Sequence, residues 1–181
     1  MGLALRLHPD SHCDAATGVA VELERPRADS LLLHYVVTGR IGDLRLPPAA
    51  VPVHADELWR TTCFEAFVRT ASGDEYYEFN FSPSTQWAAY RFSGYRAGRR
   101  VAEGTDAPAI HMQSAPLRLT LRASLALDRL AGLPRGMPWR LGLSAVIEEA
   151  NGRQSHWALA HPPGKADFHH ADCFAHELPP A

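Results

Sequence analysis

The feature that most constrains the fold of this sequence is an alternation of apolar and polar residues with a period of two. It is present at 19–24 and 31–39, is cleanest at 117–125, and returns at 140–149 and 156–161. Successive side chains of a β-strand point to opposite faces, so short alternating runs predict strands. Turn residues separate the runs, and Asn151-Gly152 is typical of a tight hairpin with positive φ at both positions.

Helical pattern is scarce, because only 125–133 is compatible with a turn or two of helix before Pro134. The longest expected loop is 46–57, because its three prolines cannot donate the backbone hydrogen bonds of a central strand. A chain of 181 residues with 46% hydrophobic and 21% charged residues fits one globular domain. The sequence therefore predicts a single all-β domain over 1–181, an antiparallel β-sandwich with little helix. A closed barrel is the alternative.

Charge and cysteine content limit the classes of partner. The formal net charge is −2 and no clustered basic stripe is present, so we expect no nucleic-acid partner. No window has the ~18–20 apolar residues of a membrane span, and the N-terminal segment lacks the pattern of a secretory signal. Three widely spaced cysteines do not suggest a disulfide framework. We expect a cytoplasmic protein without a membrane partner, and a homo-oligomer stays open.

Three candidate strands at 63–68, 76–81 and 86–92 can be divided into two faces by residue parity. The expected core face is almost wholly apolar and carries Phe64, Ala66, Val68, Tyr77, Phe79, Phe81, Ala88, Tyr90 and Phe92. The opposite face mixes acids, an amide and aromatics and carries Cys63, Glu65, Phe67, Tyr76, Glu78, Asn80, Trp87, Ala89 and Arg91. The division requires that no β-bulge interrupts these strands.

The mixed face has the chemistry of a site for a carbohydrate or another small polar ligand. Indole rings stack on the apolar faces of sugars, and carboxylates, amides and guanidinium groups bond their hydroxyls. The candidate ligand-binding residues are Trp59, Glu65, Glu78, Asn80, Trp87 and Arg91, with Lys165 on a loop at the rim. The alternative is a solvated sheet face on which Glu65 or Glu78 forms a cross-strand pair with Arg91.

Two segments also carry a family resemblance. ELWRTTCFEAFV (57–68) followed by EYYEFNFSPSTQWAAYRF (75–92) resembles the bacterial DOMON-like domain family, which is related to carbohydrate-binding module family 9. The tail HWALAHPPGKADFHHADCFAHEL resembles the C-terminal segment of that family, so the resemblance spans 58–178. It implies an immunoglobulin-like, jelly-roll-like sandwich and a binding module without chemistry of its own. Relatives bind sugars or haem, and Trp59 and Glu65 match the motif positions.

Other functions remain open at this stage. The same fold could bind a protein partner or haem, for which His111 and Met112 are nominal axial ligands. A glycoside hydrolase would use Glu65 and Glu78 as its carboxylate pair, but a sandwich of this size offers little cleft. No metal-ligand spacing is present, and the histidines of FHHADC (168–173) are interpreted as surface or capping residues. We therefore expect no catalytic residue, no metal and no cofactor.

Overall fold

The computed structural model describes residues 2–134 and 136–180. Within these ranges the chain forms an antiparallel arrangement of 12 strands and three short 3₁₀ helices. The strands are β1 (Leu3–Leu7), β2 (Ala16–Arg27), β3 (Ser30–Gly39), β4 (Cys63–Thr70), β5 (Tyr76–Phe81), β6 (Trp87–Phe92), β7 (Arg100–Val101), β8 (Ala109–Ala115), β9 (Arg118–Ala126), β10 (Trp139–Glu148), β11 (Gln154–Ala158) and β12 (His176–Leu178). The 3₁₀ helices are η1 (Ile41–Asp43), η2 (Leu58–Arg60) and η3 (Ala171–Cys173). None of the helices in the described ranges has the length and hydropathy that crossing a membrane needs.

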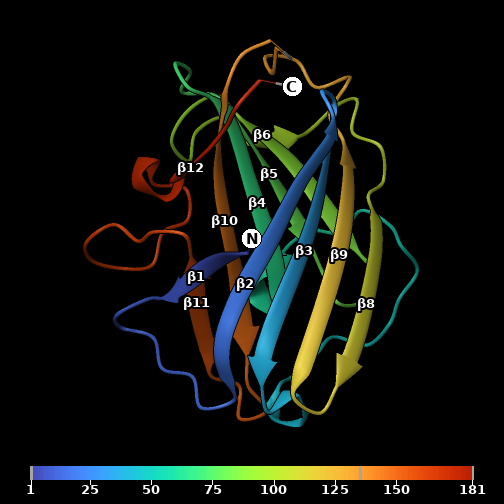
Figure 1. Cartoon of the computed structure of the whole chain (residues 1–181), viewed down its shortest axis with the longest axis vertical. Coiled ribbons are helices and arrows are strands. Elements are labelled where there is room, and N and C mark those ends of the chain that lie inside the picture. The colour runs from blue at the N-terminus through green and yellow to red at the C-terminus, as the bar shows by residue number, and fades with distance from the viewer. Residues whose placement is uncertain (1, 135, 181) are drawn as a thin grey trace.

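The strands lie in two layers, which confirms the predicted all-β sandwich. One layer contains β2, β3, β9 and β8 and faces the viewer in Figure 1, with β10, β4, β5 and β6 behind it. The strand β1 belongs to both layers, because Leu3–Leu5 pair with β2 whereas Arg6 and Leu7 pair with β11. The hydrogen-bonded order therefore runs without interruption from β7 at one edge to β8 at the other. These two edge strands do not pair with each other, so the sheet is an open sandwich rather than a closed barrel.

The main hydrophobic core fills the space between the layers. Its largest fully buried side chains include Tyr35, Phe64, Phe79, Phe81 and Trp139. The hydroxyl of Tyr35 on β3 donates a hydrogen bond of 2.7 Å to the backbone oxygen of Glu65 on β4, which ties the two layers together. The other buried tryptophan, Trp157, also packs in this core, and Leu159, two residues further on, packs against it.

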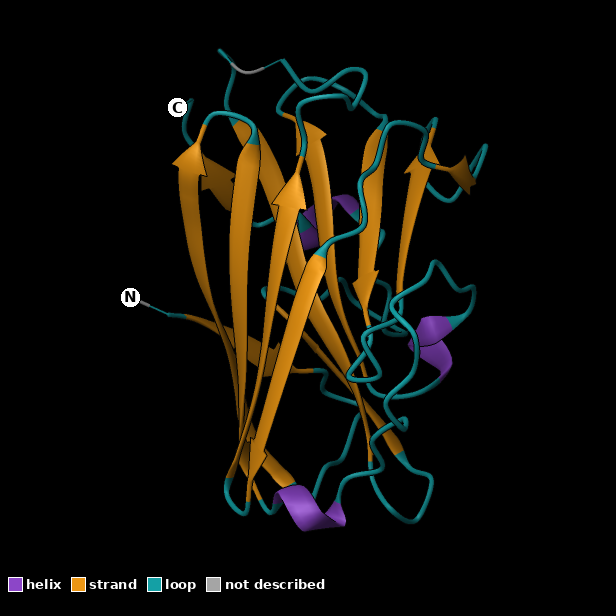
Figure 2. Ribbon diagram, turned by 90° about the vertical axis from the view of Figure 1, so that its right-hand side faces the viewer, coloured by secondary structure: helices purple, strands orange, loops and turns teal. Residues whose placement is uncertain are grey.

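A second apolar cluster lies on the outer face of the β4–β6 layer. Its buried members are Leu58, Cys63, Phe67, Tyr76, Ala88, Tyr90, Phe92, Val146, Ala158, Phe168 and Phe174. Figure 2 shows loops gathered on this side of the sandwich (right), whereas the outer face of the other layer (left) is bare. The C-terminal loop approaches β10 closely at Gly142, where an added Cβ would lie 3.1 Å from the backbone oxygen of Cys173. This outer face is therefore covered by loops rather than solvated.

The register of β6 reverses the two faces predicted for its residues. Phe81 lies opposite Trp87, and Phe79 lies opposite Ala89, so like-numbered parities of β5 and β6 share a face. The connection at 82–86 has an odd number of residues, which fixes this register, whereas we assigned the face by apolarity. Trp87, Ala89 and Arg91 therefore lie on the side of the main core, and Ala88, Tyr90 and Phe92 face the loops.

Two local predictions also differ from the structure. No helix forms at 125–133: β9 runs to Ala126, and Leu127, Leu130 and Leu133 of the following turns pack into the main core. The hairpin between β10 and β11 has positive φ at Gly152 (84°) but not at Asn151, so it is not a primed two-residue turn. The sequence patterns did not indicate β1, β7, β8 and β12. The strands β1, β7 and β12 are short, and the edge strand β8 is mostly exposed, so its residues show little alternation of buried and exposed positions.

Candidate functional site

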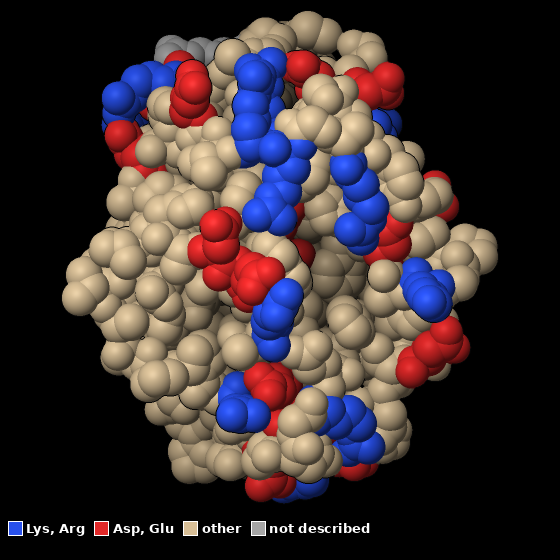
Figure 3. All heavy atoms as spheres, turned by 180° about the vertical axis from the view of Figure 1, so that it is seen from behind, with Lys and Arg blue, Asp and Glu red and all other residues tan. Residues whose placement is uncertain are grey.

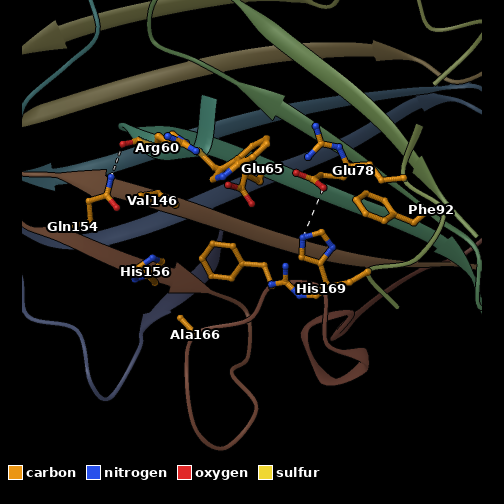
Figure 4. A pocket seen from close by; sticks show the side chains of 13 residues that line it. Arg60, Glu65, Glu78, Phe92, Val146, Gln154, His156, Ala166 and His169 are labelled. Carbon is orange, nitrogen blue, oxygen red and sulfur yellow. Dashed lines mark hydrogen bonds and ion pairs between the residues drawn. The ribbon is translucent and has the colours of Figure 1, made fainter. Parts of the chain in front are cut away.

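A cavity of about 460 Å³ lies on the loop-covered face of the β4–β6 layer. From behind the view of Figure 1 this side of the molecule is hollowed near its centre, and acidic and basic side chains gather around the hollow (Figure 3). Strands β4, β5, β6, β10 and β11, the helix η2 and two loops contribute side chains to the cavity. They are Trp59, Arg60, Glu65, Glu78, Phe92, Arg96, Arg99, Val146, Gln154, His156, Ala166, Phe168 and His169 (Figure 4).

Two buried carboxylates form the floor of the cavity. Glu65 on β4 and Glu78 on β5 are only 3% and 5% exposed. Asn80, which lies opposite Glu65, donates a hydrogen bond of 2.7 Å to Glu78 Oε1. The hydroxyl of Ser144 on β10 donates to Glu65 Oε2 at 3.3 Å, and Glu65 Oε1 has no hydrogen-bond partner among the described residues. The floor therefore contains one buried carboxylate oxygen without a hydrogen-bond partner in the described part of the chain.

Burial shifts both carboxyl groups toward their neutral forms. The pKa of Glu65 is raised well above its usual value by desolvation and by the neighbouring charge of Glu78, against which the Ser144 hydroxyl acts. Desolvation also raises the pKa of Glu78, while the bond from Asn80 and the charges of Arg99 and Arg96 oppose the rise. A ligand group that donates a hydrogen bond to either carboxylate would favour its ionised form.

An indole and a stacked arginine form one wall. Trp59 in η2 packs edge-on to Tyr90, with 6.3 Å between the ring centroids. The guanidinium of Arg99 lies 4.3 Å from the Tyr90 centroid and 5.3 Å from that of Trp59. Asp56 binds both the Tyr90 hydroxyl and, at 3.5 Å, the Arg99 guanidinium. These contacts hold the half-buried Trp59 ring at the edge of the cavity.

A polar clasp closes the opposite side. The guanidinium of Arg96 donates two hydrogen bonds to Asp167 Oδ1, at 2.7 and 3.2 Å, and the Tyr95 hydroxyl donates to Asp167 Oδ2. The backbone N–H of His169 also donates to this carboxylate, at 3.1 Å. The clasp joins the loop at 93–99 to the C-terminal loop at 159–170, and it holds the pKa of Asp167 below its usual value although burial acts in the other direction.

His169 lies beneath the clasp and contacts the acidic floor. Its Nδ1 is 2.7 Å from the Tyr76 hydroxyl, which itself accepts a hydrogen bond from the Arg96 backbone N–H. Its Nε2 is 3.8 Å from Glu78 Oε2 (Figure 4, dashed). Burial and the charge of Arg96 lower the pKa of His169 to about 4. The pKa of Glu78 is raised, so both groups are shifted toward their neutral forms. The contact at 3.8 Å is therefore weaker than one between two full charges.

We expect the His169 ring to stay neutral down to a pH of about 4. Its pKa in the unfolded chain is about 6.5, so the stability that the neutral ring contributes is present above about pH 6.5 and is lost as the pH falls through about 4. Urea unfolding at pH values above and below this window should show a larger loss for the wild type than for His169→Gln. An equal loss in the two proteins would contradict the lowered pKa.

The structure brings together only part of the predicted site. Trp59, Glu65 and Glu78 line the cavity, and Asn80 lies beneath it as a partner of Glu78. Lys165 is exposed on the C-terminal loop, adjacent in sequence to the lining residue Ala166.

The other two predicted residues lie on the opposite side of the sheet. Trp87 packs against the main core, and Arg91 forms an ion pair with Glu75 at 2.7 Å. The solvated-face alternative is also wrong, because Glu65 and Glu78 are buried and neither pairs with Arg91.

Several lining residues were not predicted from the sequence. They are Arg96, Arg99, His156, Phe168 and His169. Most come from loops, where no periodicity reports the direction of a side chain. His156 lies on a strand, opposite Val146, which in turn lies opposite Cys63 of the mixed face, but this register comes from the structure and not from a pattern in the sequence. His170 caps η3 by accepting from the Asp172 backbone N–H, as predicted, whereas His169 is mostly buried.

Other ligand types find less support in this region. Among the described residues no group of three or more His, Cys, Asp or Glu side chains is arranged to hold a metal ion. His111 and Met112 lie on β8 in the other layer and do not line the cavity.

Comparisons with solved structures identify proteins of the same fold. A candidate carbohydrate-binding protein from Bacteroides uniformis ATCC 8492 matches with a TM-score of 0.64 at 14% identity, over 91% of this chain and 79% of its own. A carbohydrate-binding module of family 9 from Caldicellulosiruptor kristjanssonii, in complex with cellotriose, matches with a TM-score of 0.52 at 12% identity, over 91% and 74%. A family 9 module of that organism in complex with glucose matches with a TM-score of 0.50 at 13% identity, over 86% and 72%.

This chain shares its fold with those modules. No family model matches the sequence, and no curated protein matches it. The likeness therefore lies in the architecture of the sandwich, at identities too low to carry over individual residues.

Proposed function

We propose that the chain is a single-domain, non-catalytic module that binds a carbohydrate in the cavity above Glu65 and Glu78. The observation that carries the proposal is a cavity that has the carboxyl groups of Glu65 and Glu78 at its floor and the Trp59 indole in its wall. A sugar ring has apolar faces for stacking and hydroxyls that donate to carboxylate oxygens. The volume of about 460 Å³ is within the ~300–1,000 Å³ of small-ligand sites.

The surroundings of the floor support a neutral polar ligand. The two acids are shifted toward their neutral forms, and the arginines at the rim are already paired, Arg60 with Glu57, Arg96 with Asp167 and Arg99 with Asp56. Neither sign of charge is left in clear excess at the cavity. The carbohydrate complexes of the family 9 modules with the same fold agree with this ligand class, as does the resemblance to the DOMON-like family.

Titration calorimetry with glucose and with cellotriose tests the proposal. We expect saturable binding by the wild type and a loss of at least about tenfold in affinity for Trp59→Ala, because a stacked aromatic contributes about 1.5 kcal/mol or more in buried area and ring contact. Trp87→Phe is the matched control, since Trp87 lies on the other face of the same layer. Its affinity should equal that of the wild type.

Three outcomes would contradict the proposal. One is the absence of saturable heat with both saccharides, and another is an affinity that Trp59→Ala leaves unchanged. The third is hydrolysis of cellotriose during the titration, which would overturn the non-catalytic part of the proposal.

A further inference from the structure

A second cavity, of about 700 Å³, adjoins the first. His169 lines both cavities, and the clasp formed by Arg96 and Asp167 lies at the boundary between them. The side chains that matter for its chemistry are those of Arg69, Asp74, Ser93 and His170. Arg69 comes from the end of β4, Asp74 from the turn before β5, and the other two from the loops that the clasp joins.

Arg69 differs from its neighbours because it has no anionic partner among the described residues. Its guanidinium lies over the Phe174 ring, 4.6 Å from the centroid, and its buried Nε has no hydrogen-bond acceptor in the described part of the chain. By contrast, Arg91 and Arg96 are bound to Glu75 and Asp167 at 2.7 Å. A partly buried guanidinium with unused donors is a recognition group for planar or tetrahedral oxyanions.

The strand register adds a second, independent argument. Arg140 on β10 lies directly opposite Arg69, on the same face of the layer. Like charges at directly opposed positions of an antiparallel pair are unfavourable. Arg140 is compensated by Glu177 at 2.9 Å, but Arg69 has no such partner among the residues that the structure describes. An anion bound at Arg69 would supply the missing compensation.

We infer that this second cavity is an oxyanion-binding site in which Arg69 is the principal binding residue. His170 lines the same cavity, and its Nδ1 accepts from the Asp172 backbone N–H, so that Nε2 carries a ring proton and can donate. The Ser93 hydroxyl also lines the cavity, but it already donates to the backbone oxygen of Ala97 at 3.4 Å. The exposed carboxylate of Asp74 lowers the affinity of the site for anions. The ligand chemistry is that of a carboxylate or sulfate group, either as a free anion or as the acidic substituent of a saccharide.

The site is tested by titration with sodium sulfate, sodium glucuronate and glucose at matched ionic strength. The readouts are calorimetry and the Nε–H resonance of Arg69 in the ¹⁵N spectrum. We expect both anions to shift the Arg69 resonance saturably and glucose, which would bind in the first cavity, to leave that resonance unchanged. Sulfate affinity should fall at least about tenfold in Arg69→Gln, since charge-assisted bonds contribute about 1.5–3 kcal/mol. It should rise about two- to fivefold in Asp74→Asn, which removes a nearby exposed charge.

Arg140→Gln is the matched control, because Arg140 lies directly opposite Arg69 on the neighbouring strand but does not line the cavity. Its sulfate affinity should stay within about threefold of the wild type, as expected for a compensated charge. Tighter binding of glucuronate than of sulfate identifies a saccharide substituent as the source, and the reverse order identifies a free anion. A linear shift without saturation, or equal affinities in wild type and Arg69→Gln, would overturn the inference.

The proposals of an oxyanion site and of a carbohydrate site can be refuted independently of each other. Arg69→Gln should leave glucose and cellotriose affinities unchanged, and Trp59→Ala should leave sulfate affinity unchanged, because the two residues line different cavities. Absence of saccharide binding with intact sulfate binding would remove only the proposed function.

Discussion

A Glu65→Gln variant is expected to be more stable than the wild type at a pH of about 8 and to bind saccharide about tenfold more weakly. The amide has the shape of the carboxyl group but no charge that burial must desolvate. The Ser144 hydroxyl would donate to the amide oxygen, as it now donates to Oε2. The amide NH₂ group would then lie at the position of Oε1, which has no hydrogen-bond partner among the described residues. The same substitution is therefore expected to raise stability and to replace a carboxylate acceptor of the cavity floor by an amide.

The pH dependence of this effect has a defined sign. The folded-state pKa of Glu65 is raised above the unfolded value of about 4.3, so the stability linked to its neutral form is complete below about pH 4.3 and is lost as the pH rises through the folded pKa. Thermal unfolding should show a higher Tm for Glu65→Gln at about pH 8, with the difference shrinking toward about pH 4.5. Each kcal/mol corresponds to a shift of about 2–4 °C for a chain of this length.

Glu103→Gln is the control for this prediction, because Glu103 is exposed and its neutralisation should move Tm very little. Glu78→Gln should resemble Glu65→Gln, and the two changes should not be additive, since each relieves the charge on the other. A Glu65→Gln variant less stable than the wild type at about pH 8 would refute the raised pKa.

Trp139→Ala is expected to lower the free energy of unfolding by about 3–5 kcal/mol and Tm by roughly 6–20 °C. The Trp139 side chain is 1% exposed, at the start of β10 in the main core. Its Nε1 donates to the backbone oxygen of Pro134 at 3.1 Å, and the Arg25 guanidinium lies 3.9 Å from the ring centroid. Truncation removes these contacts and leaves a cavity that the two facing layers cannot fill.

Guanidinium unfolding with calorimetry measures this loss. Trp87→Ala is the matched comparison, because Trp87 is only partly buried against the same core. It should cost clearly less than Trp139→Ala. Equal costs would mean that the ring of Trp139 is not enclosed between the layers.

The sequence allowed the correct prediction of the two strands that carry the floor. Alternation placed Glu65, Glu78 and Asn80 on one face, and the pairing of Glu65 with Asn80 and of Phe67 with Glu78 confirms that they share it. The prediction works because the acidic and amide side chains share one parity within each of these regular strands, so alternation separates them from the apolar residues of the core. Burial of that face was not predictable, since alternation does not report what covers a sheet.

The assignment failed at β6 for a related reason. This layer has apolar side chains on both of its faces, so the aromatic residues Tyr90 and Phe92 fit either one. Only the length of the connection at 82–86 distinguishes the faces. The clasp could not be predicted from the sequence either. Arg96 and Asp167 are far apart in the sequence and lie in loops, where no pattern indicates an ion pair.

The division of β1 between the layers has a consequence for biosynthesis. Vectorial synthesis releases β1 first, and β2, β3, β8 and β9 are complete by Ala126, but β11, to which Arg6 and Leu7 pair, ends only at Ala158. The strand β1 therefore cannot complete its pairing until β11 has been synthesised. Pairing over such sequence distances is slow to form. On the ribosome the two layers can join through β1 only after β11 has emerged.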